Sequence, residues 1–383
     1  MKIAIGIDLD WPFEHHYGIV QGILDYGREH GWECSLEPWM ERTEELSDIP
    51  DDFDGVISRS TRSLYEVCQR KAIPLVNVWY NSPVKEAPYA GLDNFAVGRK
   101  MADYFVKKGF KKIAFLGQEE DKTSFVTNEG IAEVLNKNEI ENHHLYLQTP
   151  VSQQDWEVFN AALDKWFGQF EFPLALACSD HLVARYVCEW CRKRKVLVPD
   201  DIAVLSGWSN DLICESFAPA ISHIVNKFDE IGRGAARLVE KLINGEAVEK
   251  KLLHKPGDLV ERRSTDVEPV KDRLVARAMR FIWDNSTEQI FVSDVATALK
   301  MSRRSLERRF REVLDRSVND EIVRTRIERA RKMLVNSDLS VKQISDQAGF
   351  ASNQRMSQVF RKKLGMTALE YRQKMSKGGA NDK

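Results

Sequence analysis

Two stretches near the C-terminus of the chain repeat one pattern of polar and apolar residues. Ser302 and Phe310 lie eight residues apart, and Ser352 and Phe360 repeat that spacing fifty residues later. In both stretches a bulky apolar residue comes four positions after the serine, and a leucine comes twelve positions after it. A serine that precedes an apolar stripe at helical spacing is typical of a capped amphipathic helix. The repeat therefore predicts two similar helices, each beginning after its serine.

The side chains expected on the outer faces of these two helices are suited to binding DNA. Arginine forms paired hydrogen bonds with guanine edges in the major groove, and asparagine and glutamine do so with adenine. Each assignment is a hypothesis, because arginines also contact phosphates alone or remain solvated surface charges. One face is rich in arginine and the other carries amides, which predicts contacts with two unlike segments of DNA. The candidates are Arg303, Arg304, Glu307, Arg308 and Arg311 on the first helix, and Asn353, Gln354, Arg355, Gln358 and Arg361 on the second.

Further helices are needed to position these two. Apolar residues at helical spacing predict an all-α region with helices over 273–285, 292–299, 303–314, 320–335, 341–348 and 353–364. A short helix, a tight turn and a longer helix thus occur twice, which is helix-turn-helix organisation. The long middle helix would hold the two outer faces at a fixed distance. Successive major grooves of B-DNA lie about 34 Å apart, so we expect the two helices to enter neighbouring grooves.

A set of residues in this region matches a known family in order and in spacing. The matching residues are Met301-Ser302, Leu306, Phe310, Arg326, Ala330, Leu334, Ser340-Val341, Ile344, Gly349-Phe350-Ala351-Ser352, Phe360-Arg361, Gly365, Thr367 and Tyr371-Arg372. On these residues the region strongly resembles the double helix-turn-helix domain of the AraC family, which implies a DNA-binding domain over 273–375. Asp315, Met356 and Ala368 depart from the family pattern, which has glycine, phenylalanine and proline there. The first departure is expected to strain or shift a helix end.

The distribution of charge supports a nucleic-acid partner at one end of the chain. Residues 271–383 contain 25 lysines and arginines against 14 acidic residues, whereas residues 1–270 contain 31 against 44. A basic region attached to an acidic body is typical of a protein that binds nucleic acid through that region. The alternative for the basic surplus is an ordinary solvated surface.

The acidic body shows a different pattern, in which short apolar runs alternate with helical segments. Strands are predicted over 2–7, 55–58, 74–79, 112–117, 174–179 and 201–205, and helices over 15–30, 96–108, 181–195 and 229–244. This alternation predicts parallel sheets that are covered on both faces by helices. The length suits two such sheets with a cleft between them. Ligands of open α/β sheets bind beyond the carboxyl ends of the strands.

Polar and aromatic residues follow several of these predicted strands. Carboxylates and amides beside flat aromatic faces suit a sugar, because each hydroxyl needs a hydrogen-bond partner and the C–H face of the ring stacks on an indole. The alternative is that they are ordinary strand-end caps and core tryptophans. The candidate ligand-binding residues are Asp10, Trp11, Trp79, Asp93, Ser179, Asp180, Trp208, Ser209 and Asn210, with Asp8, Tyr80 and Asn81 beside them.

Four stretches of the body match another family. They are Gly91-Leu92-Asp93-Asn94, the run from Gly109 to Gly117, Ala177-Cys178-Ser179-Asp180, and the run from Val198 to Val204. They resemble the ligand-binding domains of the LacI family, which are similar to periplasmic sugar-binding proteins. The resemblance implies a sensing domain over 1–265 with two Rossmann-like lobes. The family's pocket aspartate has no counterpart near 208–210 and its pocket arginine has none near 124–130, so the resemblance does not identify the sugar.

Other chemistry is not indicated by the sequence. Cys188 and Cys191 have redox-motif spacing but fall inside a predicted helix rather than at its start. The His15-His16 pair has no metal-ligand spacing and is expected to be a surface pair at a helix start. We expect no cofactor, no metal and no enzymatic activity. No apolar run reaches 18 residues, and the six cysteines suggest no disulfide framework, so a cytoplasmic protein without a membrane partner is expected.

The order of the two regions completes the interpretation. Pro256, Gly257 and Pro269 mark a connecting segment between 254 and 272, with the linker proper at 266–272. A LacI-like sensor ahead of an AraC-type domain, with the join over 260–266, resembles the bacterial xylose operon regulators. This resemblance implies a homodimeric activator that binds double-stranded DNA, contacts RNA polymerase and responds to a small sugar, D-xylose being the first candidate. Two alternatives stay open: a constitutive DNA binder whose body only dimerises, and an enzyme with an appended regulatory domain.

Overall fold

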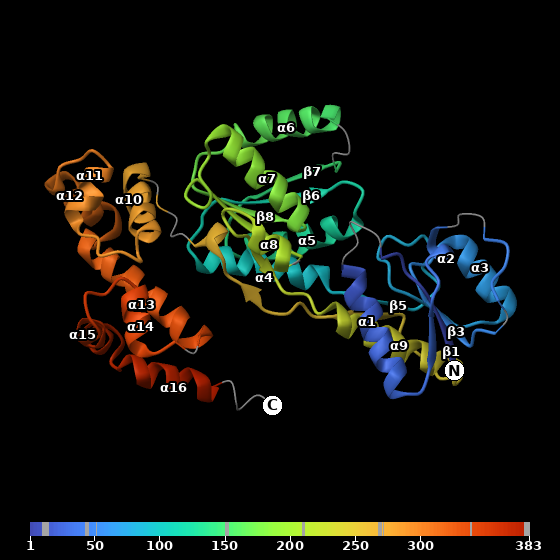
Figure 1. The fold of residues 1–383 in the computed structure, drawn as a ribbon. Helices are drawn as coiled ribbons and strands as arrows, with labels where there is room; N and C mark the ends of the chain where they lie inside the picture. Colours follow the sequence, from blue (N-terminus) through green and yellow to red (C-terminus); the bar gives the residue numbers. More distant parts are fainter. Residues whose placement is uncertain are drawn as a thin grey trace. The chain divides into compact units, whose positions relative to one another are not determined.

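The chain folds into two compact units, Met1–Pro269 and Val270–Lys383 (Figure 1). The computed structural model describes residues 1–9, 15–42, 46–50, 52–149, 153–208, 211–266, 270, 272–337 and 339–378. The first unit is α/β with two sheets and the second is all-helical. The predicted fold class is therefore confirmed.

One sheet forms the centre of the first lobe of the α/β unit. Its strand order is β11-β5-β4-β3-β1-β2, and every pair in it is parallel. The strands are Lys2–Gly6 (β1), Glu33–Leu36 (β2), Gly55–Ser58 (β3), Leu75–Asn77 (β4), Tyr89–Leu92 (β5) and Lys251–His254 (β11). Its helices are His15–Glu29 (α1), Trp39–Arg42 (α2), Arg62–Lys71 (α3) and Phe228–Ile243 (α9).

The second lobe repeats this arrangement with the order β12-β10-β9-β8-β6-β7, in which only the β10–β12 pair is antiparallel. The strands are Ile113–Gln118 (β6), Asn142–Leu147 (β7), Leu174–Cys178 (β8), Ile202–Ser206 (β9), Ser222–Ile224 (β10) and Leu259–Val260 (β12). The helices are Asn94–Lys107 (α4), Lys122–Lys137 (α5), Gln153–Phe167 (α6), His181–Arg194 (α7) and Asp211–Ser216 (α8), with a 3₁₀ turn at Arg263–Thr265 (η1).

Successive residues of the strands face two helical layers, which explains why the strands are apolar throughout. Ile3 and Ile5 pack with α1 and α9, whereas Ala4 between them packs with α2 and α3. The inner helices approach each other closely at glycines. A Cβ at Gly22 or Gly232 would lie 2.0 Å from a carbonyl oxygen of the opposite helix, so α1 and α9 can meet only where both lack side chains.

The predicted connecting segment begins too early in the sequence. β11 belongs to the sheet of the first lobe, β12 to that of the second, and η1 packs against β9 and β10. Residues 254–265 are thus part of the first unit, in spite of Pro256 and Gly257. The local proline and glycine indicate a crossing between two sheets here, which a sequence pattern alone does not distinguish from a linker.

The second unit contains two helix-turn-helix motifs. Its helices are Arg273–Asp284 (α10), Val292–Ala298 (α11), Arg303–Leu314 (α12), Val318–Asn336 (α13), Val341–Gln347 (α14), Asn353–Leu364 (α15) and Ala368–Gly378 (α16). The first motif is α11–α12 and the second is α14–α15. Each has its own apolar core, and α13 contributes Ile322 to the first and Ala330 to the second.

The predicted serine caps are present in both motifs. The Ser302 side chain accepts a hydrogen bond from the Ser305 N–H (3.2 Å), and the Ser352 side chain accepts one from the Arg355 N–H (3.1 Å). Phe310 and Phe360 are completely buried, as the repeat predicts. The local pattern of cap and stripe thus produces the same local structure twice.

Candidate functional site

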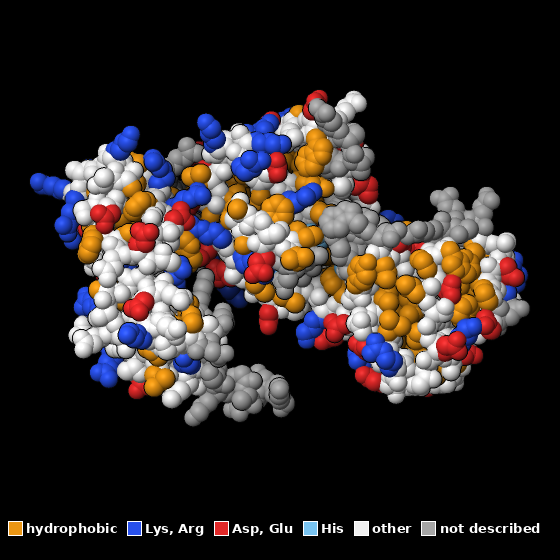
Figure 2. All heavy atoms as spheres, in the orientation of Figure 1, with side chains coloured by type: hydrophobic (Ala, Val, Ile, Leu, Met, Phe, Trp, Pro, Cys, Tyr) orange, Lys and Arg blue, Asp and Glu red, His pale blue; other side chains and the backbone are white. Residues whose placement is uncertain are grey.

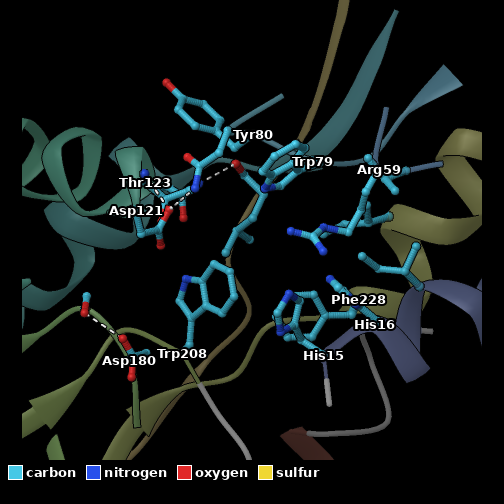
Figure 3. A pocket seen from close by; sticks show the side chains of 18 of the residues that line it. His15, His16, Arg59, Trp79, Tyr80, Asp121, Thr123, Asp180, Trp208 and Phe228 are labelled. Atoms are coloured by element: carbon cyan, nitrogen blue, oxygen red, sulfur yellow. Dashed lines mark hydrogen bonds between the residues drawn. The ribbon is translucent and has the colours of Figure 1, made fainter. Parts of the chain in front are cut away.

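A cavity of about 280 Å³ lies in the first unit, where the carboxyl ends of strands from both sheets meet (Figure 3). Its walls come from the segments that follow β3, β4, β5, β6, β8 and β9, and from the first turns of α1, α7 and α9. This is the position at which open α/β sheets bind ligands.

Four of the predicted ligand-binding residues line this cavity: Trp79, Ser179, Asp180 and Trp208. Asp93 does not line it, and its carboxylate accepts a hydrogen bond from the Ala96 N–H (2.9 Å) and caps α4. The remaining four candidates, Asp10, Trp11, Ser209 and Asn210, lie outside the described residues. The structure therefore brings together residues from three predicted strand ends and assigns a capping role to Asp93.

Asp180 organises one wall of the cavity. One carboxylate oxygen accepts hydrogen bonds from the N–H groups of Leu182 and Val183 (2.8 and 3.0 Å), and so caps α7. The other accepts them from the Ser179 hydroxyl (2.7 Å) and the Gln118 amide (2.8 Å). Asp180 therefore orients Ser179 and Gln118 toward the cavity, whatever further contact it makes with a ligand.

Arg59 supplies a cation to the opposite wall. Its guanidinium lies 4.7 Å from the centre of the Trp79 ring and pairs with the Glu41 carboxylate on α2. Burial lowers the pKa of Arg59 to about 10, with the charge of Asp8 acting against this, so the guanidinium remains charged near neutral pH. Because Glu41 balances this charge, the wall offers directed N–H donors without a large excess of positive charge.

Two histidines from the start of α1 face the same space. His15 lies edge-on to the Trp208 indole, with 4.8 Å between ring centres, and Phe228 of α9 lies 5.7 Å from that indole. Nδ1 of His16 is 2.6 Å from the Asp8 carbonyl oxygen, which can only accept, so Nδ1 carries the proton and Nε2 is an acceptor. Burial lowers the pKa of His16 to about 4 and that of His15 well below its ordinary value, so both rings are neutral near pH 7.

The expectation of a surface histidine pair is therefore wrong. The pair does begin a helix, but His16 is only 4 % exposed and both rings line the cavity. The sequence pattern contained no sign of this, since the side of α1 that faces the cavity depends on how α1 packs against α9.

A direct contact joins the two lobes at the edge of the cavity. The Asn81 amide, which follows β4 of the first lobe, donates to Asp121 (3.2 Å), the cap of α5 in the second lobe. The side-chain Oδ1 of Asn81 accepts a hydrogen bond from the Lys122 N–H (3.0 Å). The same Asp121 carboxylate accepts a hydrogen bond from the Thr123 N–H (3.0 Å). The lobes are thus hydrogen-bonded beside the space that they enclose.

Sequence reasoning missed several lining residues whose signal was available. Arg59 directly follows β3, and Gln118 ends β6, so the strand-end rule applied to every predicted strand identifies both. An arginine was expected only near 124–130, in the other lobe. Indole faces, neutral imidazoles, amides and a balanced guanidinium together suit an uncharged ligand with many hydroxyl groups.

The DNA-binding candidates of α12 lie on its outer face. Arg303, Arg304, Arg308 and Arg311 are exposed, whereas Leu306 and Phe310 on the inner face are fully buried. Glu307 is half-buried, and its carboxylate accepts from the Val318 N–H (3.3 Å) at the start of α13. This contact gives Glu307 a structural task that the sequence pattern does not show.

All five candidates of α15 are exposed on one side of that helix, and its inner side packs Met356, Val359 and Phe360 into the second core. The Arg355 guanidinium donates to the Gln358 side chain (3.4 Å), so a cation and an amide lie together on the exposed face. The two faces differ in chemistry, since α12 presents arginines and α15 presents amides among arginines.

No described helix is long and apolar enough to cross a membrane, and the described His, Cys, Asp and Glu residues form no cluster of three that could hold a metal ion. Burial raises the pKa of Cys188 to about 12 and raises that of Cys191, which makes both thiols poor nucleophiles.

Comparison with known proteins agrees with this two-part architecture. The periplasmic binding protein-like domain family matches residues 102–265, and a helix-turn-helix domain family matches residues 295–374. The xylose operon regulatory protein of Haemophilus influenzae is 27% identical over 97% of this chain and 98% of its own length. The Escherichia coli K12 protein of the same name is 25% identical over 92% of this chain and 93% of its own.

A solved structure extends this likeness to the fold of the whole chain. The structure of a xylose-binding transcription activator has a TM-score of 0.73 and 22% identity, and the match covers 97% of each chain. These relatives are transcription regulators, in agreement with the expectation that the chain is not an enzyme.

Proposed function

We propose that this chain, which belongs to the AraC-family transcription regulators with a LacI-like sensing domain, binds a small uncharged sugar in its central cavity and thereby changes how it binds operator DNA. The observation that carries the proposal is the set of hydrogen-bonding groups and indoles around the cavity, in a chain with two exposed basic recognition helices.

The charge balance of the cavity supports an uncharged ligand. His15 and His16 are neutral near pH 7, and Glu41 pairs with Arg59. An acidic sugar would leave its carboxylate without a strong cationic partner, because the guanidinium is already paired. A neutral sugar satisfies the amide of Gln118 and the imidazoles through its hydroxyls and stacks its C–H face on Trp208.

D-Xylose is the first candidate for this sugar. Three relatives that match nearly the whole chain are named for xylose, and their names support the proposal without identifying the ligand. The cavity has the hydrogen-bonding groups for a pentose, but the residues that follow Trp208 lie outside the described part, so other pentoses belong in the test.

Assembly and partners follow from the same proposal. We expect a homodimer on double-stranded operator DNA, activation through contact with RNA polymerase, and a cytoplasmic location, since regulators of this domain order act on DNA. Size-exclusion chromatography with light scattering measures the oligomeric state. A monomer that still binds its operator at full affinity would contradict the dimer.

Binding-site selection from random DNA, with and without D-xylose, tests the function. We expect one preferred sequence whose affinity changes with the sugar. Thermal-shift measurements with D-xylose, D-ribose, L-arabinose, D-glucose and D-galactose test the cavity independently, and Trp208→Ala should abolish any shift. A preferred DNA sequence with no response to any sugar would support the alternative of a constitutive DNA binder.

A further inference from the structure

The second helix-turn-helix motif touches the segment that leads into the first motif, away from the helix that joins the two. Gly349, in the turn between α14 and α15, lies against the segment 286–290 that connects α10 to α11. A Cβ at Gly349 would lie 2.3 Å from the Ser286 carbonyl oxygen and 3.0 Å from that of Glu288. Any side chain at this position would therefore push the second motif away from the first.

Lys300 of the first motif occupies the position that corresponds to Gly349 in the second. Lys300 follows α11 as Gly349 follows α14, and both have positive φ (55° and 73°). Their backbone hydrogen bonds also match, with each N–H bonded three residues back. Because Lys300 tolerates the left-handed backbone, the conformation alone does not require glycine at 349. Glycine is required at position 349 because segment 286–290 approaches too closely to leave room for a Cβ.

Two arginines of α13 complete this contact. Arg326 donates to the carbonyl oxygens of Glu288 (3.3 Å) and Ile290 (3.2 Å). Arg329, one turn later, donates to the buried Ser286 hydroxyl (3.2 Å) on one side and to the Gln347 carbonyl oxygen (3.1 Å) at the end of α14 on the other. Arg329 therefore bonds at once to the second motif and to the segment that leads into the first.

We propose that this junction, formed by Gly349, Arg326, Arg329 and segment 286–290, holds α12 and α15 at one distance and one rotation, so that operator recognition requires a fixed spacing between the two DNA segments that they contact. Gly349 and Arg329 are then positioning residues. The inference rests on the proposed DNA-binding function. The helix α13 alone joins the two motifs along the chain, and the junction adds a second connection beside it.

Changing the distance between the two DNA segments tests the junction. Each inserted base pair moves one segment by about 3.4 Å and rotates it by about 35°. With the selected operator, wild-type protein should lose roughly 30-fold or more in affinity on insertion of two base pairs, because one helix loses its contacts. Gly349→Ala and Arg329→Ala should bind the unaltered operator roughly tenfold more weakly and lose less than about threefold on insertion.

The matched control is Arg331→Ala, whose native side chain bonds to Glu328 and Tyr371 without contacting the first motif. It should keep the spacing dependence of the wild type. Circular dichroism checks that each variant is folded. If Gly349→Ala is unfolded, the loss of affinity of Arg329→Ala on insertion of two base pairs tests the junction instead. Variants that keep the full spacing penalty would overturn the junction alone, whereas a wild-type protein that selects no DNA sequence would overturn the proposed function.

Discussion

At the scale of single residues, the protonation of the cavity histidines has consequences for stability. His16 is buried and bonded to a backbone carbonyl oxygen, and its pKa is lowered to about 4. In the unfolded chain the same ring takes up a proton near pH 6.5. Between pH 6.5 and pH 4 the folded state therefore keeps His16 neutral, whereas the unfolded state binds a proton there. The stability that the neutral His16 contributes is complete above pH 6.5 and is lost as the pH falls toward 4.

We predict that the first unit loses stability as the pH falls from about 6.5 toward 4. The slope from His16 alone should approach about 1.4 kcal/mol per pH unit, because the unfolded state then binds one proton more than the folded state. Urea unfolding monitored at several pH values measures this slope, and His16→Gln should reduce it. An equal slope in the variant would show that other groups cause the pH dependence.

The exposed arginines of the recognition helices allow a second prediction at this scale. Arg308→Ala and Arg355→Ala should each weaken binding to the selected operator by about 1–3 kcal/mol if the side chain contacts a base. Gel-shift titrations with operator and random DNA measure this difference. Arg280→Ala on α10 is the matched control, since Arg280, like Arg308, pairs with an acidic residue four positions later. Unchanged discrimination between the two DNAs would assign Arg308 or Arg355 to phosphate contact.

At the scale of elements, the two recognition helices end in the same way with different residues. α12 is followed by Asp315 and α15 by Gly365, and both of these C-cap residues have the left-handed conformation (φ 51° and 70°). Asp315 was expected to strain or shift a helix end. The C-terminus of α12 lies at the same position in its motif as that of α15, so Asp315 does not shift the helix end. The strain lies in the backbone of Asp315, a non-glycine residue with positive φ. Its carboxylate also lies at the negative end of the helix dipole.

Exchanging the residues at these two ends should change stability in opposite directions. We predict that Asp315→Gly stabilises the second unit by about 1 kcal/mol, and that Gly365→Ala destabilises it by about 1 kcal/mol. No atom of the described residues lies within 4 Å of a Cβ at Gly365, so the second value should reflect backbone conformation alone. Chemical denaturation of the full-length protein measures both, and a destabilised Asp315→Gly would show that the carboxylate has a favourable partner.

At the scale of the whole molecule, the first unit holds the segment that leads out of it by bonds to α4. The Tyr104 hydroxyl is 2.7 Å from that of Thr265, and Lys108 donates to the Thr265 carbonyl oxygen (2.8 Å). The other end of α4 reaches the cavity, where Asn94 is part of the lining. One rigid helix thus connects the proposed sugar site with the exit of the chain toward the DNA-binding unit.

We predict that Tyr104→Phe leaves sugar affinity unchanged and reduces the effect of the sugar on operator affinity by roughly threefold or more, since coupling free energies are typically 1–3 kcal/mol. Tyr26→Phe is the matched control, because the Tyr26 hydroxyl donates to Glu240 (2.6 Å) within the first lobe. Calorimetry with sugar and DNA titrations at saturating sugar measure the two quantities. Equal coupling in Tyr104→Phe and wild type would exclude this route.

The sequence by itself determined the features that depend on neighbouring residues. The serine caps, the Phe310 and Phe360 stripes and the alternation of strands and helices result from local periodicity and capping, so a linear pattern suffices to find them. The exposed arginines and amides of α12 and α15 follow from the same periodicity, because one face of an amphipathic helix must be buried.

Only the tertiary structure decided which distant residues meet. His15 of α1 lies edge-on to Trp208 from the other lobe, Asp93 caps a helix rather than lining the cavity, and the arginine that lines the cavity is Arg59. Gly349 shows the same limit, since its need for glycine comes from a carbonyl oxygen more than sixty residues earlier in the chain. Such contacts are set by the packing of whole elements, and no local pattern of residues contains that information.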